Sequence, residues 1–266
     1  MTKKKGAEHG GHWEFYFFVV DGRPCSTMLD LSLISGAPDA ERPWLLSVRL
    51  PLDDPRSDGL ATNAEATRLG EIEDGLVRSL GAHCGAVFVG RMTWNGVRDL
   101  FFYAKRTETL EQALSVGLAS AGLGGTGPRR VMTRKQKDAE WRHYLDVLYP
   151  GPLEWQWIKD RRVVESLVES GDKSDIARPI DHHARFDARA KAEAWASAVR
   201  EMGFDVAIER LEGSEDAWSA HAVREDRAEL AHVHDIVERL VGLAEENQGT
   251  YDGWACAVVR GHDVRE

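Results

Sequence analysis

The stretch IDHHARFDARAKAEAWASAVREMGFDVAI, residues 180–208, reads as a strand, a helix and a second strand. Ile180–Phe186 alternates between apolar and polar positions, as a half-buried strand does. Asp187 is a residue type that caps helix starts, and Gly203 stands where a left-handed helix end is expected. The stretch therefore predicts a β-α-β unit. The helix is marked by Ala188, Ala192, Trp195, Val199 and Met202, and the second strand by Phe204, Val206 and Ile208.

The surrounding residues extend this unit in both directions. A helix over about 159–169 precedes it and ends at Gly171. After a turn at Glu212–Asp216, Trp218–Val223 is expected to pair back as a strand. Asp226 and Glu229 resemble a capping box before a further helix, and Tyr251–Val259 closes the module. The second half is thus β-α-β-β-α-β with a leading helix.

The first half repeats this order with an added hairpin. Trp13–Val20 and Cys25–Leu31 flank Asp21-Gly22, which is a hairpin signal. An apolar stripe predicts the first helix, and Thr107 is a candidate cap for the second. The remaining expected parts are a strand at Trp44–Leu50, helix residues Leu69, Ile72, Leu76 and Leu80, a hairpin of Ala86–Val89 and Leu100–Ala104 around Trp94-Asn95-Gly96, helix residues Leu110, Leu114 and Leu118, and a last strand at Trp141–Tyr149.

The repeated order predicts an α+β fold of two tandem ferredoxin-like modules, each an antiparallel sheet with its helices on one face. The other face of each sheet is expected to be available to solvent, a second module or a partner. Pro150-Gly151-Pro152 indicates a linker. We expect a disordered tail at 1–12, an α+β domain at 13–150, a linker at 151–157 and a second domain at 158–266.

Charge separates the two halves. The chain of 266 residues carries a net charge of −10; residues 158–266 hold 15 Lys and Arg against 24 Asp and Glu, a net charge of −9. Such a half repels nucleic acid and attracts cationic partners, although a need for solubility alone also explains the negative charge.

No apolar run is long enough for a membrane helix, and no secretory signal is evident at the N-terminus. Cys25, Cys84 and Cys256 follow no pairing pattern, which favours a reducing cytoplasm.

The second half resembles the RraB family, regulators of ribonuclease E activity. The resemblance is carried by three motifs in order, after a leading amphipathic helix. It implies a non-enzymatic protein without a cofactor, which binds a ribonuclease E-type enzyme and slows RNA cleavage. Family members often continue into a long acidic tail where this sequence has Gly261–Glu266, so the strength of any inhibition is left open. The motifs are Asp181-His182-His183, Met202-Gly203-Phe204-Asp205-Val206, and Ala244-Glu245 followed by Tyr251-Asp252-Gly253-Trp254.

The first half resembles a domain of unknown function, number 695. No activity is established for that family, so this resemblance does not assign one. The matching residues are Trp13–Tyr16, Asp58-Gly59, Ile72-Glu73-Asp74, and Gly90-Arg91 with Arg98–Tyr103.

Partner-binding candidates lie on two predicted strands of the second half. His182 is expected to face the core, whereas Asp181, His183 and Arg185 face the other way and are candidate contact residues. Tyr251, Asp252 and Trp254 form either the corner of a core or part of a contact surface. Adjacent His182 and His183 point to opposite faces and cannot share one metal ion. His232 and His234 diverge on a helix, so we expect no metal site.

No catalytic residue is predicted. Glu71 and Asp74 share one helix face but read as an exposed acidic surface, and the Gly122–Gly127 loop lacks the residues of a phosphate-binding loop. Phe101, Phe102 and Tyr103 lack the basic context of an RNA-stacking surface, so direct nucleic-acid binding is not expected. The alternative from another class is a small-molecule-binding or hydrolytic protein that uses an interdomain cleft.

Overall fold

A computed structural model describes residues 11–122, 131–211 and 216–260. The chain divides into two compact units, Met1–Pro150 and Gly151–Glu266. Residues 1–10 of the expected tail, the Gly-rich loop after Gly122, most of the Glu212–Asp216 turn and Gly261–Glu266 lie outside the described residues. His12 is already tied into the fold, because its backbone N–H donates to Asp30 Oδ1 at 3.0 Å.

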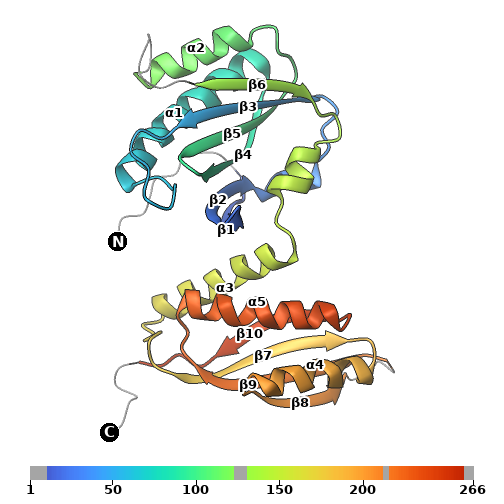
Figure 1. Cartoon of the computed structure of the whole chain (residues 1–266). Coiled ribbons are helices and arrows are strands. Elements are labelled where there is room, and N and C mark those ends of the chain that lie inside the picture. Colours follow the sequence, from blue (N-terminus) through green and yellow to red (C-terminus); the bar gives the residue numbers. More distant parts are fainter. Residues whose placement is uncertain (1–10, 123–130, 212–215, 261–266) are drawn as a thin grey trace. The chain divides into compact units, whose positions relative to one another are not determined.

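The first unit is a six-stranded antiparallel sheet with two long helices. Its strand order is β1-β2-β4-β5-β3-β6, so β3-α1-β4-β5-α2-β6 forms a ferredoxin-like core and β1-β2 is the predicted extra hairpin (Figure 1). The elements are β1 (Trp13–Val20), β2 (Arg23–Asp30), the 3-10 helix η1 (Leu31–Ser35), β3 (Trp44–Pro51), α1 (Asn63–Cys84), β4 (Val87–Trp94), β5 (Val97–Ala104), α2 (Leu110–Ser120), β6 (Met132–Lys137) and the π-helix η2 (His143–Leu148).

Local sequence accounts for these turns and helix ends. Both hairpins turn through two residues of positive φ, Asp21-Gly22 and Asn95-Gly96, which is the backbone that such tight turns need. The Thr62 side chain accepts a hydrogen bond from the Glu65 N–H at the start of α1, and Gly85 is left-handed at its end. The apolar stripe of α1 is buried as predicted: Leu69, Ile72, Leu76 and Leu80 are at most 1% exposed.

The expected last strand at Trp141–Tyr149 is wrong. The last strand of the first unit is β6. The residues in and around η2 instead pack their aromatic rings against the aromatic rings of the sheet. Trp141 stacks on Tyr103 with 4.1 Å between ring centroids, and its Nε1 donates to Arg42 O. The Tyr144 hydroxyl donates to Asp30 O. The apolar spacing that we interpreted as a strand therefore belongs to a short helix packed beside β5.

The second unit has the ferredoxin-like topology without an added hairpin. Its four antiparallel strands have the order β10-β7-β9-β8, and Figure 1 shows them with α3, α4 and α5. One apolar core joins these three helices to the sheet, with Trp195 fully buried in it. The elements are α3 (Pro152–Glu169), β7 (Arg178–Phe186), α4 (Arg189–Glu201), β8 (Asp205–Arg210), β9 (Trp218–Asp226), α5 (Leu230–Glu246) and β10 (Thr250–Cys256).

Three expectations for this unit need correction. The leading helix begins at Pro152 and not at about residue 159, so residues 152–157 of the expected linker are helical; Pro is well suited to the first turn of a helix. Asp187 caps no helix, since α4 starts after Ala188 and Asp187 pairs with Lys191 instead. Asp226 ends β9 and bonds Arg224 and His232, so it forms no capping box with Glu229.

None of the described helices is both long enough and apolar enough to cross a membrane.

Candidate functional site

The candidate site lies on the face of the second sheet opposite α3, α4 and α5. Along β7, Ile180, His182, Ala184 and Phe186 are buried, whereas the alternate positions are not. Their side chains are partly or well exposed: 42% for Asp181, 34% for His183 and 59% for Arg185. The predicted division of β7 into a core face and an open face is therefore confirmed. We call the second of these the open face.

Arg185 is held at one side of the open face. Its Nε and Nη2 atoms donate to the two carboxylate oxygens of Asp252 at 2.6 and 2.7 Å. This paired geometry raises the pKa of Arg185 above its usual value. The bridge joins β7 to β10 and fixes the direction of an otherwise mobile side chain.

Asp252-Gly253 forms a β-bulge within β10. The register with β7 shifts between Tyr251 and Gly253, and Gly253 has a φ of 140°. An extra residue in a strand changes which face the following side chains meet. Tyr251 and Trp254 therefore both point into the core, although they are three positions apart in the sequence.

Tyr251 and Trp254 are only 7% exposed, which supports the core interpretation of the pair. The Tyr251 hydroxyl lies 2.7 Å from His182 Nδ1, and Trp254 Nε1 donates to Asp160 Oδ1 at 2.9 Å. Burial raises the pKa of Tyr251, so its hydroxyl stays protonated. Of the three candidates on β10, only Asp252 presents its polar group on the open face.

Asp160 is the centre of a buried polar cluster that we did not predict. Its carboxylate is fully buried and also accepts a hydrogen bond from Gln156 Nε2 at 3.1 Å. Burial raises the pKa of Asp160 to about 6, although the hydrogen bonds from Gln156 and Trp254 oppose this change. His234 Nε2 lies 4.0 Å from the other carboxylate oxygen. The sequence carries no signal for this burial, because Asp160 stands in the charged run Lys159-Asp160-Arg161-Arg162.

His182 is a core histidine, as predicted. It is 1% exposed, and burial lowers its pKa to about 4, so the ring is neutral in the folded chain at neutral pH. Its Nδ1 meets the Tyr251 hydroxyl, and its ring lies edge-on to Phe204. The contact with Tyr251 anchors β7 to β10, whereas the buried Nε2 of His182 has no hydrogen-bond partner among the described residues.

His221 is a further residue of the open face that was not predicted from the sequence. It lies on β9 directly across from His183, and the two ring centroids are 4.4 Å apart. Asp181 lies two residues before His183 on the same face, with Oδ2 3.4 Å from His183 Nε2 and Oδ1 3.9 Å from His221 Nδ1. Strand pairing between β7 and β9 was needed to bring these residues together.

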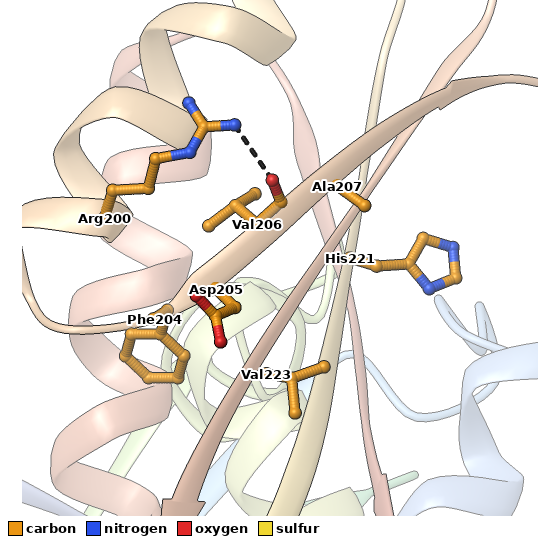
Figure 2. A pocket seen from close by; sticks show the side chains of 7 residues that line it. All are labelled: Arg200, Phe204, Asp205, Val206, Ala207, His221 and Val223. Atoms are coloured by element: carbon orange, nitrogen blue, oxygen red, sulfur yellow. Dashed lines mark hydrogen bonds between the residues drawn. The ribbon is translucent and has the colours of Figure 1, made fainter.

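A hollow of about 600 Å³ runs along the edge strand β8. Figure 2 shows its walls, with Arg200 donating to Val206 O at 2.9 Å and the His221 ring extending away from the sheet. The hollow is open and carries only scattered ionisable groups. It lies within the second unit. Its lining residues are Arg200, Phe204, Asp205, Val206, Ala207, His221 and Val223.

In the first unit, Glu73 of α1 pairs with Arg91 of β4 and joins the helix to the sheet. Glu73 lies between Glu71 and Asp74, is 5% exposed and accepts a hydrogen bond from Arg91 Nη1 at 2.6 Å. Phe101 and Tyr103 are buried, Tyr103 beneath Trp141, so their rings offer no surface for base stacking. Phe102 points to the opposite, helix-covered face, as strand alternation predicts.

The two folds together define an α+β protein of two ferredoxin-like units. Residues 157–256 match the family "Regulator of ribonuclease activity B", and residues 11–149 match "Family of unknown function (DUF695)". The chain belongs to the RraB family through its second unit and to the DUF695 family through its first.

Curated relatives match the second unit at modest identity. A regulator of ribonuclease activity B from Pseudoalteromonas translucida is 32% identical over 103 residues, which are 38% of this chain and 92% of the relative. The Photobacterium profundum protein of the same name is 30% identical over 40% of this chain and 83% of its own length. The Escherichia coli protein is 31% identical over 40% of this chain and 78% of its own length.

Proposed function

We propose that this chain regulates a ribonuclease by binding to it, without catalysing a reaction, and that the open face of the second unit makes the contact. The observation that carries the proposal is that the RraB-matching unit packs α3, α4 and α5 on one side of its sheet and presents Asp181, His183 and Arg185 on the other. Curated relatives of this unit are named regulators of ribonuclease activity.

Charge favours a basic partner segment. Residues 158–266 carry a net charge of −9, which attracts cationic polypeptide and repels RNA. The target implied by the family resemblance is a ribonuclease E-type endoribonuclease with basic, flexible segments. Binding would slow RNA cleavage by steric and electrostatic occlusion. We place this activity in the cytoplasm, in keeping with the three free cysteines.

The test is an RNA-cleavage assay with a purified ribonuclease E-type enzyme, together with the affinity of the full-length chain for that enzyme at low and high salt. The wild type is expected to bind, to slow cleavage and to bind more weakly in high salt. The double variant Asp181→Ala, Arg185→Ala is expected to lose about tenfold in affinity, equivalent to about 1.4 kcal/mol.

A matched control is available on the other side of the same unit. Arg189 and Glu193 form an exposed ion pair on α4. Replacing both by alanine removes the same types of charge without touching the open face, so affinity should not change. Absence of binding at low salt would refute regulation of this target, whereas equal affinities of wild type and the Asp181, Arg185 variant would remove the open face from the contact.

A further inference from the structure

Three potential metal ligands converge on the open face. Within the described residues, Asp181, His183 and His221 each place one ligand atom within 4.8 Å of the other two. The arrangement follows from strand geometry. Residues two apart on a strand share a face, and His183 and His221 are directly opposed across the antiparallel β7–β9 pair.

The distances are close to those that a metal ion imposes. Bonds of about 2.0–2.2 Å at tetrahedral angles place ligand atoms roughly 3.3–3.6 Å apart. Asp181 Oδ2 and His183 Nε2 are already 3.4 Å apart, and Asp181 Oδ1 and His221 Nδ1 are 3.9 Å apart. All three ligand atoms lie within 4.8 Å of one another, so binding an ion requires side-chain rotations that bring them closer together.

Asp181 Oδ1 has an unusual environment. This oxygen is shielded from solvent and has no hydrogen-bond partner in the described part of the chain, although the side chain as a whole is partly exposed. A buried carboxylate oxygen without a partner is costly, and a cation between it and His221 would satisfy it. The oxygen therefore marks the side of the carboxylate on which an ion would be bound.

Neighbouring charges favour a cation. Arg185, the basic side chain nearest along β7, is turned to Asp252 and neutralised by it. On the opposite side of Asp181, Val223 of β9 pairs with Asp181 of β7 and with Asp205 of β8. The Asp205 carboxylate therefore lies on the same face of the sheet as Asp181, with β9 between them. Figure 2 shows Asp205 beside Val223.

We propose that Asp181, His183 and His221 form a binding site for a divalent transition-metal ion of the Zn²⁺ type. Two imidazoles and one carboxylate suit such ions, whereas Mg²⁺ and Ca²⁺ prefer oxygen ligands alone. The three side chains come from one face of a sheet, so the ion keeps coordination positions on its solvent side. Water or a side chain of another molecule fills those positions. The site does not depend on the proposed ribonuclease partner.

The experiment is calorimetric titration of the metal-free full-length chain with ZnCl₂, followed by Co²⁺ absorption spectroscopy. The wild type is expected to bind one Zn²⁺ ion with a measurable binding enthalpy. With Co²⁺ it is expected to give visible absorption bands typical of an ion with a low coordination number. His221→Ala and the near-isosteric Asp181→Asn are each expected to weaken binding by about tenfold or more. His232→Ala, at an exposed histidine outside the cluster, should bind like the wild type.

Thermal unfolding gives an independent readout. An ion bound only to the folded chain raises the unfolding temperature, so Zn²⁺ should stabilise the wild type and the His232→Ala variant but not the His221→Ala variant. Two results would overturn the proposal. One is the absence of saturable binding by the wild type, and the other is unchanged affinity and stoichiometry in the double variant His183→Ala, His221→Ala.

Discussion

Trp254 on β10 donates its indole N–H to Asp160 on α3 at 2.9 Å, and this bond joins positions 94 residues apart in a fully buried site. The leading helix of the second unit is therefore bound to the last strand by a polar contact as well as by apolar packing. Gln156 donates to the same oxygen, so one carboxylate satisfies two buried donors. Loss of this carboxylate affects both partners at once.

We expect Asp160→Ala to destabilise the second unit by about 2–4 kcal/mol, because two buried donors lose their acceptor. Hydrogen exchange followed by mass spectrometry can assign the loss to this unit. Faster exchange in β7 and β10, with unchanged exchange in β3 and β5, is the expected pattern. Equal exchange of wild type and variant throughout β10 would contradict the role of Asp160.

Two buried groups of the second unit, Asp160 and His182, make the stability of the fold depend on pH in opposite directions. Burial raises the pKa of Asp160 from 3.8 to about 6, so its contribution to stability is present below pH 3.8 and is lost as pH rises through 6. Burial lowers the pKa of His182 from 6.5 to about 4, so its contribution is present above pH 6.5 and is lost as pH falls through 4. Each change corresponds to roughly 3 kcal/mol, and the two oppose each other between pH 4 and 6.

Single variants should separate the two contributions. Asp160→Asn keeps an acceptor for Trp254 but cannot ionise, so the variant is expected to lose stability more steeply than the wild type as pH falls from 6.5 to 4. His182→Asn should show the reverse, gaining stability relative to the wild type over the same interval. Urea unfolding at several pH values measures both slopes. Parallel pH profiles for all three proteins would show that neither buried group titrates as described.

The sequence alone predicted the ferredoxin-like order of both units, because apolar spacing and turn residues report local structure. The stripe of α1 and the hairpin at Asn95-Gly96 are examples. It did not predict the π-helix η2. There Tyr144, together with Trp141 just before the helix, packs beside sheet aromatics in a pattern that also suits a strand. At β10, the bulge at Asp252 places Trp254 on the same face as Tyr251, which strand alternation alone does not indicate.

The same limit applies to the candidate site. Alternation within β7 placed Asp181, His183 and Arg185 on one face, which needed no knowledge of other strands. His221 could be added only with the β7–β9 register, because 38 positions separate it from His183 and no local motif links them. Pairings between residues far apart in the sequence depend on tertiary structure, so sequence periodicity cannot predict them.

Close packing of α1 against α2 predicts that alanine will lower stability at one glycine of α1 and raise it at another. A Cβ added at Gly75 would lie 2.5 Å from Gly117 O on α2, whereas one added at Gly70 would meet nothing within 4 Å. Gly75→Ala should therefore destabilise by about 1–3 kcal/mol through overpacking. Gly70→Ala should stabilise by up to about 1 kcal/mol through helix propensity. Thermal unfolding of both variants checks the signs, and stabilisation by Gly75→Ala would contradict the close approach of the helices.

Two aspartate–arginine pairs of the second unit should differ strongly in their effect on stability. Asp172 and Arg178 are almost fully buried, and the same Asp172 oxygen accepts the Val259 N–H at 2.7 Å. Asp252 and Arg185 have good paired geometry but lie on the open face. Removing one partner of a buried pair leaves an uncompensated charge, whereas an exposed pair is well solvated when broken.

We therefore expect Asp172→Ala to cost about 3–5 kcal/mol and Asp252→Ala to cost no more than about 1 kcal/mol. Urea unfolding at low and at high salt measures both, and salt should reduce only the small effect at Asp252. If the contact surface includes the open face, Asp252→Ala should still weaken partner binding, because it releases Arg185 from its fixed direction. A large loss of stability in Asp252→Ala would instead assign the Arg185–Asp252 bridge to the stability of the sheet.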